Sequence, residues 1–193
     1  MAPTPASTMR FCWRWLAKAQ QYDLSSLDGA FDRFFSLFVV HNRLYSHMAR
    51  VLGQPAGGDR KSATRLFARA VGHEVLRTAL TEDEGQSDIQ RLGQLIDPDG
   101  PFYLISTKGT DEPDADRNRD LRRRLECNEA KTKVEAVLEY LYLIRCNMFH
   151  GAKDFDNSQL AIIQPATRVL ERVVRAGLDK LEVDARRTPH NAI

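Results

Sequence analysis

The chain is poor in cysteine, with only Cys12, Cys127 and Cys146 among its 193 residues. These three are far apart, their number is odd and no CxxC pair occurs, which argues against a disulfide framework and against a zinc knuckle. The HExxH pattern of zinc peptidases is also absent, and His73 and Glu74 are adjacent rather than one helical turn apart. We therefore expect a protein of a reducing, cytoplasmic interior that uses neither a metal nor a cofactor.

Long hydrophobic runs are lacking as well. The longest apolar stretch, residues 34–40, is far shorter than the roughly 18 residues that are needed to span a bilayer. Residues 1–9 contain no basic segment followed by an apolar one, so we expect no secretory signal. The sequence thus predicts no contact with a membrane.

An excess of charge of one sign is missing too. Lys and Arg number 28 and Asp and Glu 26, which leaves a formal net charge of +2. A nucleic-acid site would therefore have to arise from local clustering. Arg outnumbers Lys by 21 to 7, a bias that suits forked contacts to phosphate but also fits a GC-rich genome. The densest arginine run, residues 117–124, is interrupted and flanked by acids and is interpreted as a solvated helix face.

What the sequence does have is apolar residues at steps of three and four, which is typical of amphipathic helices. No internal repeat and no useful strand alternation occurs. Helices are expected at residues 9–20, 26–52, from 59 to beyond 76, at 88–96, 116–149 and 158–183. The predicted fold class is all-α, an antiparallel helical bundle of four to six helices with two long core helices, 26–52 and 116–149. The predicted domain spans residues 9–183, with flexible tails at 1–8 and 184–193.

Breaker residues define the segment between the fourth and fifth helices. Residues 97–116 are rich in Pro, Gly and acids and are expected to form an exposed loop. Phe102 to Ile105 are expected to pack back on the body, or alternatively to form a short strand. Pro165 lies near the start of the last helix, which is expected to be kinked or to begin later than Asn157 or Ser158.

The end of the second long helix contains the residues of greatest chemical interest. Arg145 follows Leu141 by four residues, on the edge of the apolar stripe, where a buried cation needs a partner or an open cleft. His150 is five residues further on, about 140° around a continuous helix and about 7.5 Å along it. Gly151 favours a left-handed turn that would let His150 swing toward the next helix. The sequence thus predicts a fixed cation and a titratable base near one helix end.

Such a pair suits RNA cleavage, because RNA carries its own nucleophile in the 2′-hydroxyl group. Histidine is a natural base near neutral pH. Arginine can offset the charge that develops on phosphorus through its forked donors. Asn147 could orient the phosphate or the histidine through its amide. No metal is required for this chemistry.

The segment resembles the HEPN family, whose ribonuclease members have an Arg-x4–6-His motif in a helical domain. Arg145, Asn147, Phe149, His150, Gly151 and Lys153 read as R-x-N-x-F-H-G-x-K and look like that motif. The helix FFSLFVVHNRLYSHM is similar to the aromatic helix, with an Asn and a Tyr, that often precedes it in stand-alone members. The resemblance implies an endoribonuclease, in the setting of a toxin or defence effector, with Arg145, Asn147 and His150 catalytic and Lys153 and Asn42 binding substrate. It also implies a homodimer in which both copies of the motif meet across a two-fold axis, and an antitoxin or other regulatory partner.

Other interpretations stay open. Many family members have a polar residue directly after the arginine, where this chain has Cys146 and places the Asn one position later. That difference favours a non-catalytic helical module that binds RNA, a nucleotide or a protein partner. Arg145 could instead pair with a core acid while His150 completes a helix cap. Asn42, placed by its spacing near the apolar face of its helix, could bond to the motif loop or be a satisfied core amide.

Overall fold

The structure is a computed structural model that describes residues 4–54, 58–96, 103–110, 112–149 and 157–187. The described part is all-α, as predicted, and its one β-type contact is an isolated bridge between Ser106 and Pro113. The helices, together with the π-helical turn η1 and the 3₁₀ turn η2, are α1 (Pro5–Ala19), α2 (Leu27–Val51), α3 (Asp59–Lys61), η1 (Ser62–Leu66), α4 (Phe67–Val71), α5 (His73–Thr81), α6 (Gly85–Leu95), α7 (Ala115–Glu126), α8 (Ala130–Phe149), η2 (Asn157–Gln159) and α9 (Leu160–Arg187).

Two helices reach into segments that were predicted to be flexible tails. Helix α1 begins at Pro5, four residues before the predicted start at Met9, and Thr4 caps it by accepting a hydrogen bond from the Ser7 amide. Proline is favoured at the first helical position, because its missing N–H is not needed there. At the other end, α9 continues to Arg187. The predicted boundaries at residues 8 and 184 are therefore wrong by several residues, and residues 1–3 and 188–193 lie outside the described part.

Two predicted helices are split, so the described part has more helices than the four to six expected. Gly72 has φ +106°, in the left-handed region, and separates α4 from α5. The predicted helix 116–149 ends at Glu126, because Cys127 is extended. Glu129 then accepts hydrogen bonds from the amides of Lys131 and Thr132, which caps the start of α8.

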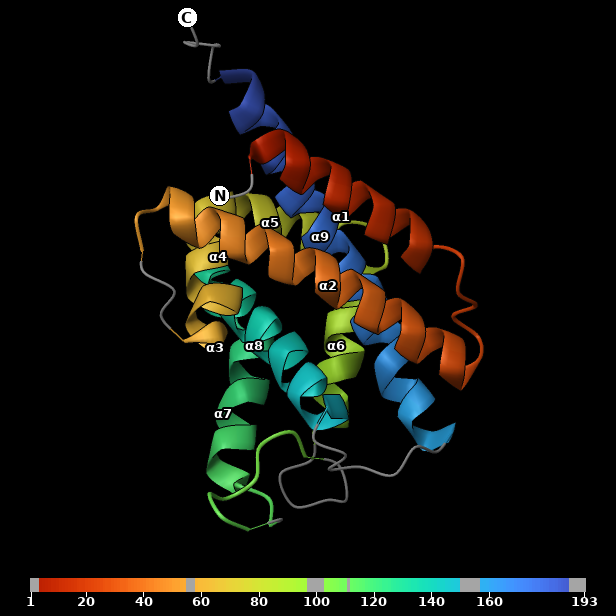
Figure 1. Ribbon diagram of the computed structural model, residues 1–193. Coiled ribbons are helices and arrows are strands. Elements are labelled where there is room, and N and C mark those ends of the chain that lie inside the picture. Colours follow the sequence, from red (N-terminus) through yellow and green to blue (C-terminus); the bar gives the residue numbers. More distant parts are fainter. Residues whose placement is uncertain (1–3, 55–57, 97–102, 111, 150–156, 188–193) are drawn as a thin grey trace, which may run out of the picture.

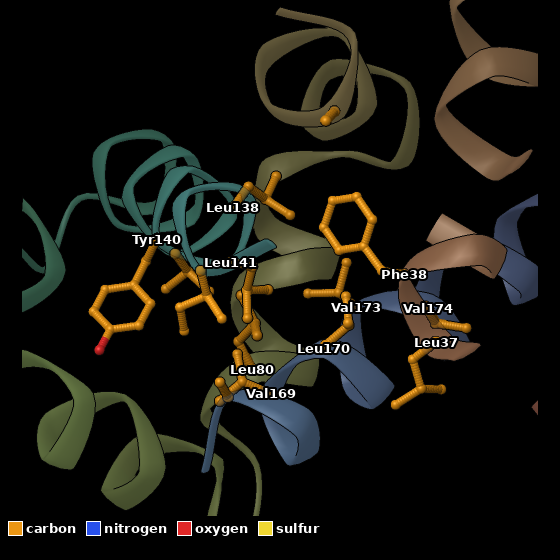
Figure 2. Packing of buried hydrophobic residues seen from close by; sticks show 14 of the residues in the cluster. Leu37, Phe38, Leu80, Leu138, Tyr140, Leu141, Val169, Leu170, Val173 and Val174 are labelled. Carbon is orange, nitrogen blue, oxygen red and sulfur yellow. The ribbon is translucent and has the colours of Figure 1, made fainter. Parts of the chain in front are cut away.

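The core lies where α2 and α9 pack against each other, with α1 covering the outer side of α2 and α8 lying beneath (Figure 1). Leu37 and Phe38 of α2 meet side chains from α8 and α9 in one cluster (Figure 2). The spacing of apolar residues predicts the inner faces of the last two helices, and burial confirms it for most of them: Val134, Val137, Leu138, Leu141 and Ile144 of α8, and Ile163, Ala166, Val169, Leu170, Val173, Val174 and Leu178 of α9. Met148 and Leu160, at the ends of these predicted faces, are only partly buried.

The segment before α7 is held to the body by one buried amide. The Asn118 side chain accepts hydrogen bonds from the amides of Leu104 and Ile105 and donates to the Ile105 carbonyl. Both Leu104 and Ile105 are buried, so the expectation that this segment packs back on the core is confirmed for these residues. Phe102 lies outside the described residues.

None of the helices among the described residues combines the length and the apolar composition that crossing a bilayer requires.

Candidate functional site

Arg145 lies one turn before the end of α8, and its side chain is 28% exposed. Its Nη1 atom is 3.8 Å from Oδ2 of Asp59. The guanidinium carbon lies 5.7 Å from the ring centroid of Phe38 and 6.0 Å from that of Tyr142, within cation–π range. The prediction that this arginine finds a partner is confirmed, and the partners come from α2, α3 and α8.

Asp59 is the centre of this group. Its carboxylate accepts hydrogen bonds from the hydroxyl of Tyr45, on α2, and from the hydroxyl of Tyr142, on α8, the latter over 3.4 Å. We call Tyr45, Asp59, Tyr142 and Arg145 the Asp59 cluster. Asp59 is the first residue of α3, whose N-cap is Gly58, and no side-chain capping bond is made there.

Both tyrosines of the Asp59 cluster are held in the protonated state. Burial, followed by the hydrogen bond to Asp59 and its negative charge, raises the pKa of Tyr45 well above its usual value. Burial, followed by electrostatic interactions with Cys146 and Asp59, raises the pKa of Tyr142 to about 12. At neutral pH the two hydroxyls are therefore donors to Asp59, and the cluster has one anion and one fixed cation.

A buried histidine supports the cluster from behind. His41 is 2% exposed and its ring packs edge-on against Phe67 and against Tyr45, with ring centroids 4.6 and 5.3 Å apart. Its Nε2 atom lies 3.1 Å from the Ala63 carbonyl oxygen, within η1. Burial lowers the pKa of His41 to about 4, so the neutral ring donates this hydrogen bond at neutral pH. Helix α2 thus fixes both Tyr45 and the turn that follows Asp59.

Two other residues at the end of α8 differ in their surroundings. The Asn147 amide donates a hydrogen bond to the Leu104 carbonyl over 3.3 Å. Asn147 is two positions after Arg145, so the two side chains leave the helix in directions about 160° apart. Asn147 thus braces the segment before α7 and does not join the Asp59 cluster. The Cys146 thiol, by contrast, accepts a contact from Arg145 Nη1 at 4.0 Å.

Asn42 does not lie on the apolar face of α2, contrary to the prediction. Its side chain is exposed and its Oδ1 accepts a hydrogen bond from the hydroxyl of Ser46. The buried stripe consists of residues spaced by three and four, and Asn42 is one residue, or about 100°, beyond it. The members of that stripe are Phe34, Leu37, Phe38, His41, Leu44, Tyr45 and Met48.

The remaining predicted site residues lie outside the described residues. His150 directly follows the end of α8, and Lys153 follows His150 by three positions. The approach of His150 to Arg145 stays a prediction.

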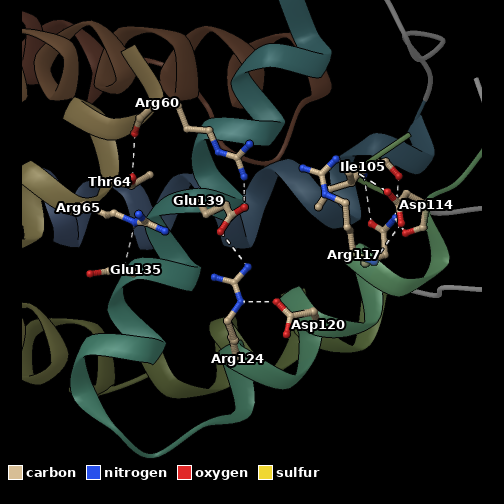
Figure 3. A network of polar contacts seen from close by, with 11 residues as sticks. Arg60, Thr64, Arg65, Ile105, Asp114, Arg117, Asp120, Arg124, Glu135 and Glu139 are labelled. Carbon is tan, nitrogen blue, oxygen red and sulfur yellow. Dashed lines mark hydrogen bonds and ion pairs between the residues drawn. The ribbon is translucent and has the colours of Figure 1, made fainter. Parts of the chain in front are cut away.

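A second polar feature borders the Asp59 cluster and was not expected from the sequence. A cleft of about 770 Å³ lies between the α3–η1 segment, α7 and α8. Within it, the Glu139 carboxylate binds both Arg60 and Arg124, and Arg124 also binds Asp120 (Figure 3). We call it the polar cleft. Arg119, Arg122 and Arg123 pair with acids of α7, in agreement with the interpretation of residues 117–124 as a solvated helix face. Arg124 is the exception, because it also binds Glu139 of α8.

Comparisons with known proteins found no counterpart: no family model, no curated protein and no solved structure matches this chain. The functional argument therefore depends on the site itself. The site consists of the partly buried Arg145 side chain, two aromatic rings within cation–π range of it, and the Asp59 carboxylate, which accepts hydrogen bonds from two tyrosine hydroxyls. A guanidinium is a forked donor that suits a phosphate or another oxyanion.

Proposed function

We propose that this chain is a metal-independent endoribonuclease of HEPN type, acting as a toxin or defence effector. The observation that supports this most is the setting of Arg145. Its side chain is 28% exposed, its guanidinium lies within cation–π range of Phe38 and Tyr142, and His150 follows it by five positions in the sequence. Such a guanidinium is oriented before substrate arrives, which is what stabilisation of a developing charge requires.

In the proposed reaction the 2′-oxygen of RNA attacks the adjacent phosphorus. The 2′-O–P bond forms and the bond from phosphorus to the 5′-oxygen breaks. His150 takes the proton of the 2′-hydroxyl or returns one to the leaving 5′-oxygen, and Arg145 binds the phosphate. The products are a 2′,3′-cyclic phosphate end and a 5′-hydroxyl end. Lys153 is proposed to contact the RNA backbone. The positions of Asn147 and Asn42 lend no support to their proposed roles.

The experiment is an RNA cleavage assay in the presence of a chelator. We expect the wild-type protein to cut single-stranded RNA and to leave cyclic phosphate ends, and His150→Ala and Arg145→Ala to reduce the rate by at least about 100-fold. His190→Ala and Arg91→Ala are matched controls, and circular dichroism checks that each variant is folded. Cleavage at the wild-type rate by purified His150→Ala would defeat the proposal.

The alternative is a non-catalytic HEPN-like module that binds RNA, a nucleotide or a protein partner. The pairing of Arg145 with Asp59 favours this alternative, because the Asp59 carboxylate, 3.8 Å from Nη1, competes with a substrate phosphate for the guanidinium. Binding of RNA without cleavage under any condition would select this alternative.

The proposed assembly is a homodimer with both motifs at one two-fold axis, restrained by an antitoxin or other regulatory protein. A single isologous contact would bring two copies of Arg145 together. Light scattering on the purified protein measures the mass of the assembly. A monomeric mass at working concentrations would remove the dimer from the proposal.

A further inference from the structure

Helix α8 presents one polar stripe to the α3–η1 segment along most of its length. From its start, Lys131, Thr132, Glu135 and Glu139 line the polar cleft. The same stripe continues, at steps of three, to Tyr142 and Arg145. The cleft and the Asp59 cluster are therefore two parts of one surface.

Ion pairs and hydrogen bonds join this segment to α8 from Glu135 to Arg145. Arg65 is 3.6 Å from Glu135, Arg60 binds Glu139, and Asp59 contacts Tyr142 and Arg145. With a rise of about 1.5 Å per residue, the stripe from Lys131 to Arg145 is about 21 Å long. This length accommodates several nucleotides of an extended strand.

The lining of the polar cleft is unusual for a protein groove, because it includes no apolar side chain. It consists of Gly58, Arg60, Lys61, Thr64, Arg65, Asp120, Arg124, Lys131, Thr132, Glu135 and Glu139. Sites for drug-sized ligands and for partner helices are mostly apolar at their centre. A phosphate backbone, by contrast, is bound by basic and hydroxyl side chains. Two aromatic rings, of Phe38 and Tyr142, lie beside Arg145 at the other end of the stripe.

The charge balance of the cleft is positive. Five basic side chains face three acids, and the acids are already bound to Arg60, Arg65 and Arg124. Among the described residues, neither Lys61 nor Lys131 forms an ion pair through its Nζ atom, although the Glu129 carboxylate accepts a hydrogen bond from the Lys131 backbone amide. These two lysines supply the surplus of positive charge among the side chains that line the cleft. Ion pairs at a surface are worth only about 0–1 kcal/mol, so Arg60 and Arg65 can exchange a carboxylate for a phosphate at little cost.

We propose that the polar cleft is the path along which a single RNA strand reaches Arg145. Lys61 and Lys131 each contact one backbone phosphate, and Arg60 and Arg65 contact the phosphates between them and the Asp59 cluster. The inference rests on the proposed function for its substrate, RNA, and adds where the strand lies on this chain. Because the contacts are to phosphate, binding through the cleft has no base specificity.

The test measures binding of a short, fluorescently labelled single-stranded RNA whose 2′-hydroxyls are methylated, so that it cannot be cut. The affinity is measured across a range of salt concentrations. Each phosphate contact to a single strand contributes about 0.7 to the slope of log affinity against log salt. Lys61→Ala combined with Lys131→Ala should therefore lower the slope by about 1.4. The matched control combines Lys18→Ala with Arg91→Ala, two exposed cations outside the cleft, and should leave the slope at its wild-type value.

The outcomes separate this inference from the proposed nuclease activity. An unchanged slope in the cleft variant, or no binding by the wild-type protein, overturns the RNA path whatever the cleavage assay shows. A lowered slope together with no cleavage of unmodified RNA supports the path and removes the nuclease proposal. Thermal unfolding of both double variants at the wild-type temperature shows that a lost contact, not a lost fold, explains the result.

Discussion

At the scale of single residues, His41 is a buried group whose charge state the fold constrains. It is buried among Phe38, Tyr45 and Phe67, and burial lowers its pKa from about 6.5 to about 4. Between these two pH values the unfolded chain binds a proton that the folded chain does not. The stability contributed by the neutral ring is therefore complete above about pH 6.5 and is lost as the pH falls toward 4.

Substitution of His41 by glutamine tests this linkage. Glutamine can still donate to the Ala63 carbonyl, but it does not titrate. We expect the wild-type protein to lose about 3 kcal/mol more unfolding free energy than His41→Gln between neutral pH and pH 4. Urea denaturation at a series of pH values measures the difference, with His190→Gln as the control. Parallel pH profiles for wild type and His41→Gln would show that folding does not lower the pKa of His41.

Asp59 is the residue of the candidate site that most directly opposes anion binding. Its carboxylate lies 3.8 Å from Arg145 and its side chain is 46% exposed. Asp59→Asn keeps an acceptor for the tyrosine hydroxyls and removes the charge. We expect RNA to bind about 1.4- to fivefold more tightly, since exposed pairs of this kind contribute about 0.2–1 kcal/mol. Asp116→Asn, an exposed acid of α7, is the matched control, and weaker binding by Asp59→Asn would show that the charge positions Arg145 instead.

At the scale of helices, the closest approach in the core depends on a glycine. A methyl group on Gly177 of α9 would lie 2.9 Å from Cζ of Phe67 and 3.1 Å from Cδ1 of Leu44. Both neighbours are fully buried, so they have little room to move. A methyl group on Gly93 of α6, in contrast, would meet nothing within 4 Å.

The two glycines therefore predict opposite effects of the same substitution. Gly177→Ala should lower the unfolding free energy, because overpacking costs about 1–3 kcal/mol against a helix-propensity gain of up to about 1 kcal/mol. Gly93→Ala should raise it by up to about 1 kcal/mol, because only the propensity gain applies. Chemical denaturation of both variants decides the matter. If Gly177→Ala is as stable as Gly93→Ala, α9 is not packed on Phe67 and Leu44 as described.

Helix faces were predictable from the sequence, but helix ends and contacts between distant residues were less so. The stripes of α8 and α9 follow from local spacing, which burial of one face imposes. The break before α8 was missed because Glu129 looks like one more charged helix residue until its carboxylate is seen to cap the Lys131 and Thr132 amides. Asp59 was missed as a site residue because its partner Arg145 is 86 positions away, and no local pattern records such a contact.

At the scale of the whole molecule, the proposed homodimer predicts that two differently inactivated chains complement each other. If both motifs meet at a two-fold axis, an assembly made of one Arg145→Ala chain and one His150→Ala chain still holds one intact arginine and one intact histidine at the shared site. Each variant alone lacks one of the two groups altogether. Mixing the two inactive proteins, with time for subunits to exchange, should therefore restore part of the cleavage activity.

The expected recovery is a substantial fraction of the wild-type rate, because random exchange places about half of the chains in mixed dimers. Mixing Arg145→Ala with the double variant Arg145→Ala/His150→Ala is the matched control, since no pairing of those chains contains an intact arginine. Activity is read as release of 2′,3′-cyclic phosphate ends from unmodified RNA. Recovery in the first mixture alone would establish that the two subunits complete one site. If subunit exchange is confirmed by mass and the first mixture stays as inactive as the control, the active site must lie within a single chain, and the stripe from Lys131 to Arg145 would then have to supply it without a partner.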